Sequence, residues 1–114
     1  MDYYCVRLLV IILVDDGKPR KRNTCDHPFV IFGAKDDQHA FQRALKWGKQ
    51  HEHRYKNIKG QWVRWAFVEV ESIKLLGRKL DGLEIGSVLA DHYSKTPIPF
   101  NKRFHPEKSK VVYD

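Results

Sequence analysis

Residues 8–14 form an unbroken run of seven apolar side chains near the start of the chain. The run is too short to cross a bilayer, which requires about 20 apolar residues. The wider segment 3–14 is rich in β-branched, aromatic and aliphatic residues and is typical of a strand. Its even positions are all apolar, and its odd positions are apolar except at Arg7. We therefore predict a strand that is central or covered on both faces, and its odd face is a possible subunit contact.

The residues that follow predict a hairpin. Residues 15–26 contain Gly17 and Pro19 and favour a long polar loop. A second strand is expected at about residues 28–34, with Pro28 at its start or on an edge because proline cannot donate a ladder hydrogen bond.

A helix is predicted after Asp36 or Asp37, because either carboxylate can cap the first turn. The helical spacing continues to about Tyr55 and places small and apolar side chains on one face, with basic ones opposite. Asn57 and Gly60 then indicate a turn. A third strand is expected over residues 61–73, with a bulge near Phe67 because the apolar alternation changes phase there. Residues 80–89 are a candidate for a further short strand.

This order, β-β-α-β-β, predicts an α+β fold: a mostly antiparallel sheet of three to four strands with one amphipathic helix packed across it. The chain has 114 residues, of which 42% are hydrophobic and 31% charged, and this is typical of one globular domain. We expect the domain to occupy residues 1–94 and to be followed by an irregular basic tail over residues 95–114.

Two cysteines are too few for a disulfide scaffold. If the hairpin has its midpoint near Arg20, Cys5 lies opposite a residue around Lys35 and Cys25 opposite one around Asp15. The two sulfurs are then too far apart to bond. We therefore expect free thiols, a reducing compartment and a cytoplasmic location.

Basic residues exceed acidic ones by seven and gather in the loop at residues 17–22, in residues 35–60 and near the C-terminus. A positive field of this kind attracts phosphates or acidic proteins, although it can also reflect solvated loops. The predicted anion-binding residues come from the loop and from the outer side of the helix: Lys18, Arg20, Lys21, Arg22, Arg43, Lys46 and Lys49.

The segment 55–65 is the most informative stretch for recognition, because aromatic and basic residues alternate within it. Trp62 and Arg64 share one face of the predicted strand, where an indole and a guanidinium can stack on each other or hold a nucleobase and a phosphate. For Trp65, on the other face, a place in the core is the simpler interpretation. Trp62 and Arg64 remain candidates for recognition.

No residues predict a catalytic, metal or cofactor site. His51 and His53 point in nearly opposite directions on a helix, so they cannot hold one ion. Glu69 and Glu71 share a strand face, but a solvated surface is the better explanation. Cys5 lies in an apolar strand and should be inert. A chemical role for His51, Glu69 and Glu71 stays open.

Several residues resemble a known family, with the most specific block lying between Tyr55 and Val68. The matching residues are Tyr4, Val6, Arg7, Leu8, Tyr55, Lys56, Asn57, Gly60, Val63, Arg64, Trp65, Phe67, Val68, Asp81, Gly82 and Glu84. Over residues 3–87 the chain is similar to the bacterial domain-of-unknown-function family 4288. The resemblance implies a small bacterial α+β domain and transfers no catalytic role. The basic loop at residues 18–22 and the tail after Tyr93 lie outside the shared pattern.

These observations favour a non-catalytic module that binds a polyanion, with nucleic acid as the preferred partner. The alternative is a protein-interaction domain, such as an immunity or adaptor protein that binds an acidic protein, or a homodimer formed through the odd face of the first strand. A metal-dependent hydrolase using His51, Glu69 and Glu71 ranks third.

Overall fold

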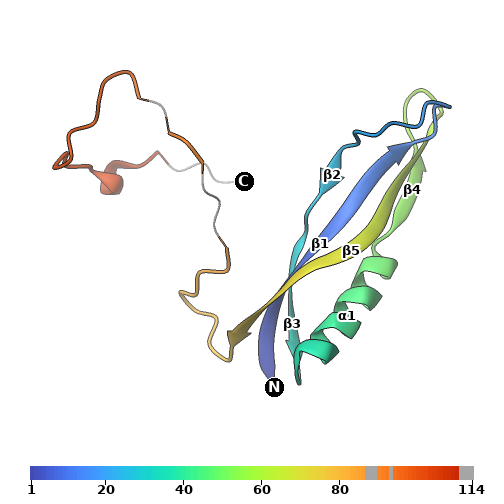
Figure 1. Ribbon diagram of the computed structural model, residues 1–114, viewed down its shortest axis with the longest axis horizontal. Coiled ribbons are helices and arrows are strands. Elements are labelled where there is room, and N and C mark those ends of the chain that lie inside the picture. The colour runs from blue at the N-terminus through green and yellow to red at the C-terminus, as the bar shows by residue number, and fades with distance from the viewer. Residues whose placement is uncertain (87–89, 93, 111–114) are drawn as a thin grey trace.

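The computed structural model describes residues 1–86, 90–92 and 94–110 and confirms the α+β class (Figure 1). One helix lies between the third and fourth of five strands in an antiparallel sheet. The elements are β1 (Asp2–Val14), β2 (Cys25–Asp26), β3 (Phe29–Ala34), α1 (Asp37–Gln50), β4 (His53–Lys56), β5 (Trp62–Gly77) and a short 3₁₀ helix, η1 (Pro106–Lys108).

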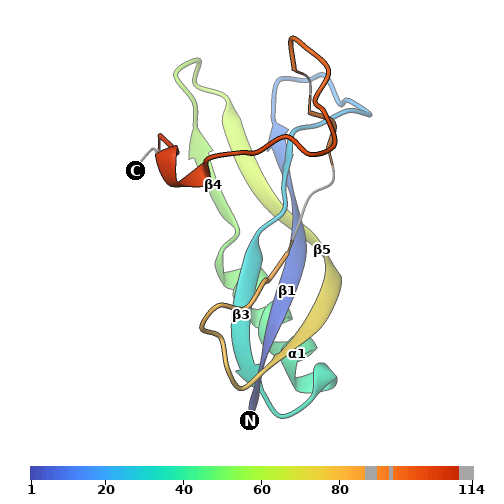
Figure 2. The same ribbon diagram turned by 90° about the vertical axis from the view of Figure 1, so that its left-hand side faces the viewer.

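β1 is the central strand, as its apolar sequence predicts. It pairs with β5 along nearly its whole length on one edge, and with β2 and β3 on the other. β4 completes the sheet beyond β5. The long β1–β5 ladder therefore joins the half of the sheet that carries the helix to the half that carries the β4–β5 hairpin (Figure 2).

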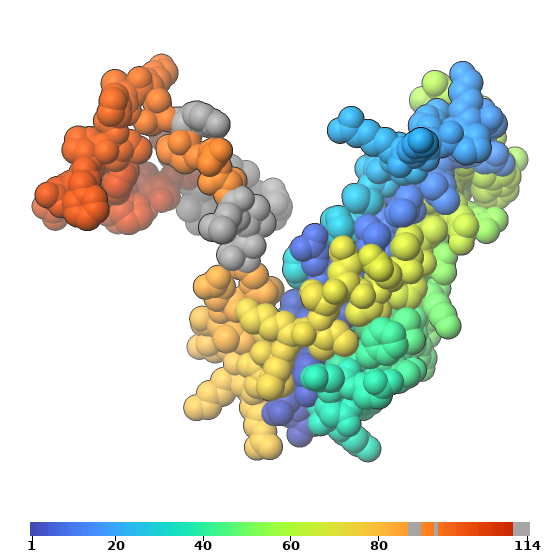
Figure 3. Space-filling model, in the orientation of Figure 1, coloured from blue at the N-terminus to red at the C-terminus, as the bar shows by residue number. Residues whose placement is uncertain are grey.

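α1 packs on one face of the sheet only, against β1, β3 and β5. Val6 and Leu8 of β1 are fully buried beneath the helix, in one cluster with the helix residue Ala44. The helix lies directly against β5, on the side away from the C-terminal segment (Figure 3). Asp36 caps the helix by accepting a hydrogen bond from the His39 backbone amide, as predicted for a carboxylate at this position.

The opposite side of the sheet is named the open face, because no described helix or strand packs on it. It carries the odd-numbered side chains of β1 and the residues beside them in the ladders. On β1 these are Tyr3, Cys5, Arg7, Leu9, Ile11 and Leu13. The sequence predicted that β1 is either central in the sheet or covered on both faces. Among the described residues, α1 packs on one of these faces.

The bulge predicted near Phe67 is present, and β5 has further irregularities. The pairing with β1 shifts between Leu9 and Val10, which leaves Val68 as an extra residue on β5. The pairing shifts again between Arg7 and Leu8, which leaves Glu71 as a second extra residue on β5. Because each extra residue reverses the alternation, Phe67, Val70 and Ile73 all reach the core under α1.

The predicted end of the helix is wrong. α1 ends at Gln50, and His51 is its C-cap rather than an interior residue. The His51 imidazole donates from Nδ1 to the Trp47 carbonyl oxygen at 2.8 Å and stacks on the Trp47 ring. The four residues after Glu52 form β4 instead, because their backbone groups pair with β5. Helical spacing that continues to Tyr55 does not outweigh a complete antiparallel ladder.

Two further details differ from the sequence prediction. β2, a two-residue strand opposite Val10 and Ile11, lies within the segment expected to be loop. Residues 80–86 form no strand, and residues 87–89 of the predicted strand lie outside the described residues. Cys5 pairs with Ile31 and Cys25 with Ile11, so the hairpin is offset from the expected register, but both thiols are free as predicted.

The chain leaves the sheet after β5 and leads through turns to η1 (Figure 1). Within the part of the chain that the structure describes, no helix has the length and hydropathy to span a membrane.

Candidate nucleic-acid interface

The β4–β5 hairpin is formed by a tight turn around Asn57. The Asn57 carboxamide oxygen accepts hydrogen bonds from the backbone amides of Lys59 and Gln61, both at 3.0 Å. Gly60 has a φ of 74°, a left-handed conformation that favours glycine. Because the turn sets the register, Lys56 lies opposite Trp62 and Arg54 opposite Arg64.

These four side chains lie on the open face, since Arg64 is the ladder partner of Leu13. Trp62 is half exposed, with 50% of its surface accessible to solvent. The Lys56 ammonium lies 5.3 Å from the centre of the indole ring, a cation–π contact. The hairpin therefore presents an aromatic face and three cationic side chains on one surface.

A hollow of about 300 Å³ lies between this cluster and the end of β1. Its lining is mostly apolar, and the polar groups in it are two guanidinium groups and one carboxylate. The lining residues are Leu13, Val14, Asp15, Arg54, Trp62 and Arg64. The indole ring is complementary in shape to a flat base, and the two guanidinium groups are complementary in charge to the phosphates of a nucleotide.

The cationic charge of the hairpin is only partly compensated. An Arg64 guanidinium nitrogen lies 3.7 Å from a carboxylate oxygen of Glu52, which is a weak and largely exposed ion pair. Arg54 has no ion-pair partner among the described residues. Like charges directly opposite each other in a ladder destabilise the pairing. An anion bound between the two guanidinium groups would relieve that repulsion.

Residues 15–24, the link between β1 and β2 that contains the basic loop, lie at the same end of the sheet as the hairpin turn (Figures 1 and 2). The Asp15 amide donates to the Trp62 carbonyl oxygen, which ties the start of the loop to β5. Arg20 is held by Asp16 at 2.5 Å, and this hydrogen bond lowers the pKa of the Asp16 carboxyl. The other predicted bases of this loop, Lys18, Lys21 and Arg22, are exposed.

Residues 3–87 match the family described as a domain of unknown function, DUF4288. The chain belongs to the DUF4288 family. The matched residues contain all of the sheet except Asp2, and they include α1 and the β4–β5 hairpin with Trp62 and Arg64. No curated protein and no solved structure matches the chain.

The DUF4288 fold separates the basic residues that the sequence grouped together. Arg43, Lys46 and Lys49 lie on α1, across the sheet from the open face. Arg43 donates to the Gly33 carbonyl oxygen at 2.6 Å and lies over the Phe32 ring. Lys46 and Lys49 are exposed. The helix bases therefore do not join the hairpin and the loop in one continuous patch.

The residues considered for metal chemistry do not come together. Among the described residues, no group of three or more histidine, cysteine or acidic side chains has metal-site geometry. His51 caps the helix, and Glu69 is exposed on β5. Glu71 contacts Arg7 and His27 instead of Glu69, because the bulge at Glu71 changes its direction.

The sequence interpretation missed the part that Arg54 and Lys56 play in the DUF4288 hairpin, because the helix was expected to continue to about Tyr55, which places Arg54 in its last turn and Lys56 just after it. A signal was present: basic and aromatic residues alternate from His53 to Lys56, directly before the turn residues Asn57 and Gly60. Such alternation beside a turn is typical of a hairpin strand.

Proposed function

We propose that this domain is a non-catalytic module that binds single-stranded nucleic acid on the open face, at the β4–β5 hairpin. The observation that carries the proposal is the half-exposed Trp62 ring on the same surface as Arg54, Lys56 and Arg64. Stacking platforms flanked by cations are the general solution for holding unpaired bases and their phosphates.

A base would stack on the free side of the Trp62 ring, and its phosphates would contact Arg54 and Arg64. Guanidinium groups suit this role because they bind phosphate oxygens through two parallel hydrogen bonds. A single strand fits better than a duplex, because only unpaired bases expose a face for stacking. Asp15 also lines the hollow, and its negative charge would turn phosphates towards the arginines.

The basic loop extends the cationic surface beyond the hairpin. Lys18, Lys21 and Arg22 are exposed in this loop, which lies at the same end of the sheet as the hairpin turn (Figure 2). A strand that crosses Arg54, Lys56 and Arg64 on the hairpin can continue towards this loop. The excess of seven basic residues in the whole chain adds a long-range attraction for polyanions.

The direct test is fluorescence anisotropy with a labelled single-stranded oligonucleotide at several salt concentrations. The logarithm of the binding constant should fall linearly with the logarithm of salt, with a slope of about −0.7 for each phosphate bound. A duplex of the same length should bind more weakly. Absence of binding to DNA and RNA single strands at low salt would remove the proposal.

A second candidate, homodimerisation through the open face, is favoured by the apolar side chains near its centre. Phe29 and Ile31 on β3 are 56% and 43% exposed, and their ladder partners on β1 are Arg7 and Cys5. Contiguous exposed apolar surface on a sheet commonly marks an interface. Sedimentation equilibrium tests this: a dimer that Ile31→Asp converts to a monomer supports the second candidate, and a wild-type monomer at all concentrations excludes it.

A further inference from the structure

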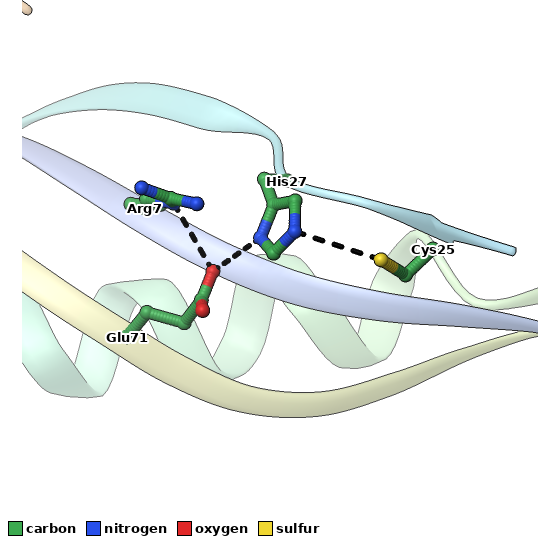
Figure 4. A network of polar contacts seen from close by, with 4 residues as sticks. All are labelled: Arg7, Cys25, His27 and Glu71. Atoms are coloured by element: carbon green, nitrogen blue, oxygen red, sulfur yellow. Dashed lines mark hydrogen bonds and ion pairs between the residues drawn. The ribbon is translucent and has the colours of Figure 1, made fainter. Parts of the chain in front are cut away.

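Four polar side chains on the open face form a connected chain of contacts that ends at a thiol (Figure 4). Arg7 Nε lies 3.2 Å from Glu71 Oε1. The same carboxylate oxygen lies 2.5 Å from His27 Nδ1, and His27 Nε2 lies 3.6 Å from Cys25 Sγ. His27 is therefore placed between a carboxylate on one side of its ring and a thiol on the other.

Three separate segments supply this cluster. Cys25 is in β2 at the edge of the sheet, and His27 follows it in the link to β3. Glu71 is the extra residue of a β5 bulge, and Arg7 is on β1 between the two. The bulge places Glu71 on the same side of the sheet as Arg7, within reach of the β2–β3 link.

The hydrogen bonds determine which ring nitrogen carries the proton. A carboxylate only accepts, so His27 Nδ1 donates to Glu71. In the neutral imidazole, Nε2 then has a free lone pair, and this lone pair faces the Cys25 thiol. Hydrogen bonding to His27 lowers the pKa of the Glu71 carboxyl, with Arg7 contributing in the same direction, so the carboxylate remains charged.

We propose that Cys25 is a peroxide-sensitive thiol, activated by His27 as proton acceptor, with Glu71 and Arg7 holding the imidazole in position. A nucleophile, a base and a group that orients the base are the parts that activate a thiol. Cys25 is exposed, so a small hydroperoxide can reach it, whereas Cys5, the other thiol of the chain, is buried.

The reaction is a two-electron oxidation of sulfur. His27 Nε2 accepts the thiol proton, and the Cys25 sulfur attacks one oxygen of the hydroperoxide. An S–O bond forms as the O–O bond breaks, and the electron pair leaves with the other oxygen. That oxygen takes the proton from His27 and departs as an alcohol, or as water when the reagent is hydrogen peroxide. The product is a sulfenic acid at Cys25, a reversible modification.

The experiment exposes the folded full-length protein to hydrogen peroxide in the presence of dimedone, which traps sulfenic acids, and locates the adduct by peptide mass. We expect the adduct at Cys25 and none at Cys5. Cys25→Ser should abolish labelling. Oxidation of Cys25 no faster in the folded protein than in urea would overturn the proposal.

The role of His27 is tested with His27→Ala, which alters an exposed link and should leave the fold intact by circular dichroism. We expect the rate of oxidation to fall about tenfold, less than for an enclosed base because this site is open to water. Added imidazole should restore part of the rate in this variant and have no effect on the wild type. An unchanged rate in His27→Ala would contradict the assignment of the base.

Glu71 is a positioning residue, and Glu69 on the same strand provides a matched control. Glu71→Gln should lower the rate, and Glu69→Gln should not. Nitrogen NMR of the His27 ring adds a readout that a merely structural role would not change. The wild type and Glu69→Gln should show the proton on Nδ1, and Glu71→Gln should show a mixture of tautomers. Unchanged ring signals in Glu71→Gln would exclude the positioning role.

Discussion

Arg54 and Arg64 lie directly opposite each other in the β4–β5 ladder, and Glu52 lies within ion-pair distance of Arg64. Two positively charged side chains directly opposite each other destabilise the pairing of the strands that carry them. The hairpin nevertheless forms, held by the Asn57 turn and by the stacking of His53 between Tyr55 and Trp65 on the other face. An opposed pair of arginines is expected where the fold accepts a small loss of stability to bind an anion.

The first prediction is that Arg54→Thr separates stability from binding. Threonine favours strands and removes the repulsion, so the free energy of unfolding should rise by roughly 0.2–1 kcal/mol. Affinity for a single-stranded oligonucleotide should fall, because the variant has one fewer guanidinium group to bind phosphate. Urea unfolding and anisotropy measure the two effects. A variant that binds as tightly as the wild type would show that Arg54 does not contact the ligand.

The second prediction separates the loop bases from the helix bases. Lys21→Ala with Arg22→Ala should weaken binding and make the salt slope shallower by about 0.7 for each phosphate that the variant no longer binds. Lys46→Ala with Lys49→Ala removes the same charge from α1 and serves as the matched control. The control should keep the wild-type salt slope. A larger decrease in affinity in the helix variant than in the loop variant would place the interface on α1.

The third prediction concerns Gly48, a buried glycine in the interior of α1. A β-carbon at this position would lie 2.6 Å from the Phe67 ring, closer than van der Waals contact allows. Gly48→Ala should therefore destabilise the fold by about 1–3 kcal/mol through overpacking, despite the higher helix propensity of alanine. Lys49→Ala, one residue along on the exposed side, should be nearly neutral. Thermal unfolding of both variants gives the comparison.

The fourth prediction is a pH dependence that arises from Glu71. The folded pKa of this carboxyl lies below its ordinary value of 4.5, chiefly because of the hydrogen bond from His27. A lowered folded pKa adds stability above the ordinary value, and this stability is lost as pH falls through the folded pKa. Glu71→Gln should thus be less stable than the wild type at pH 7, with the difference shrinking below about pH 4.5. Glu69→Gln, a change of the same kind on the same strand, is the matched control variant.

Much of the fold follows from local patterns in the sequence. The apolar segment that contains residues 8–14 predicts the central strand, Asp36 predicts the start of the helix, and the phase change near Phe67 predicts the bulge. In each case, neighbouring residues carry the signal. The end of α1 was mispredicted because the partner of β4 is β5, which comes later in the chain.

The candidate sites were predictable only in part, because some of their residues meet only through the pairing of strands that are distant in the sequence. Trp62 and Arg64 are two residues apart on one strand, so alternation alone places them on one face. Arg54 joins them only through the ladder, and Glu71 meets Cys25 and His27 from a segment that is far from them in the chain. A bulge at Glu71 decides which face its carboxylate reaches, and no pattern in the sequence gives the position of that bulge.

The indole signals of the three tryptophans provide the most direct test of the proposed interface. In a nitrogen–proton NMR titration with a single-stranded oligonucleotide, the Trp62 indole should shift strongly, while Trp47 on α1 and Trp65 on the opposite face should move little. Trp62→Ala should then weaken binding by about 1–3 kcal/mol, the usual contribution of one stacked base. An oligonucleotide that binds without shifting the Trp62 signal would contradict the proposed interface.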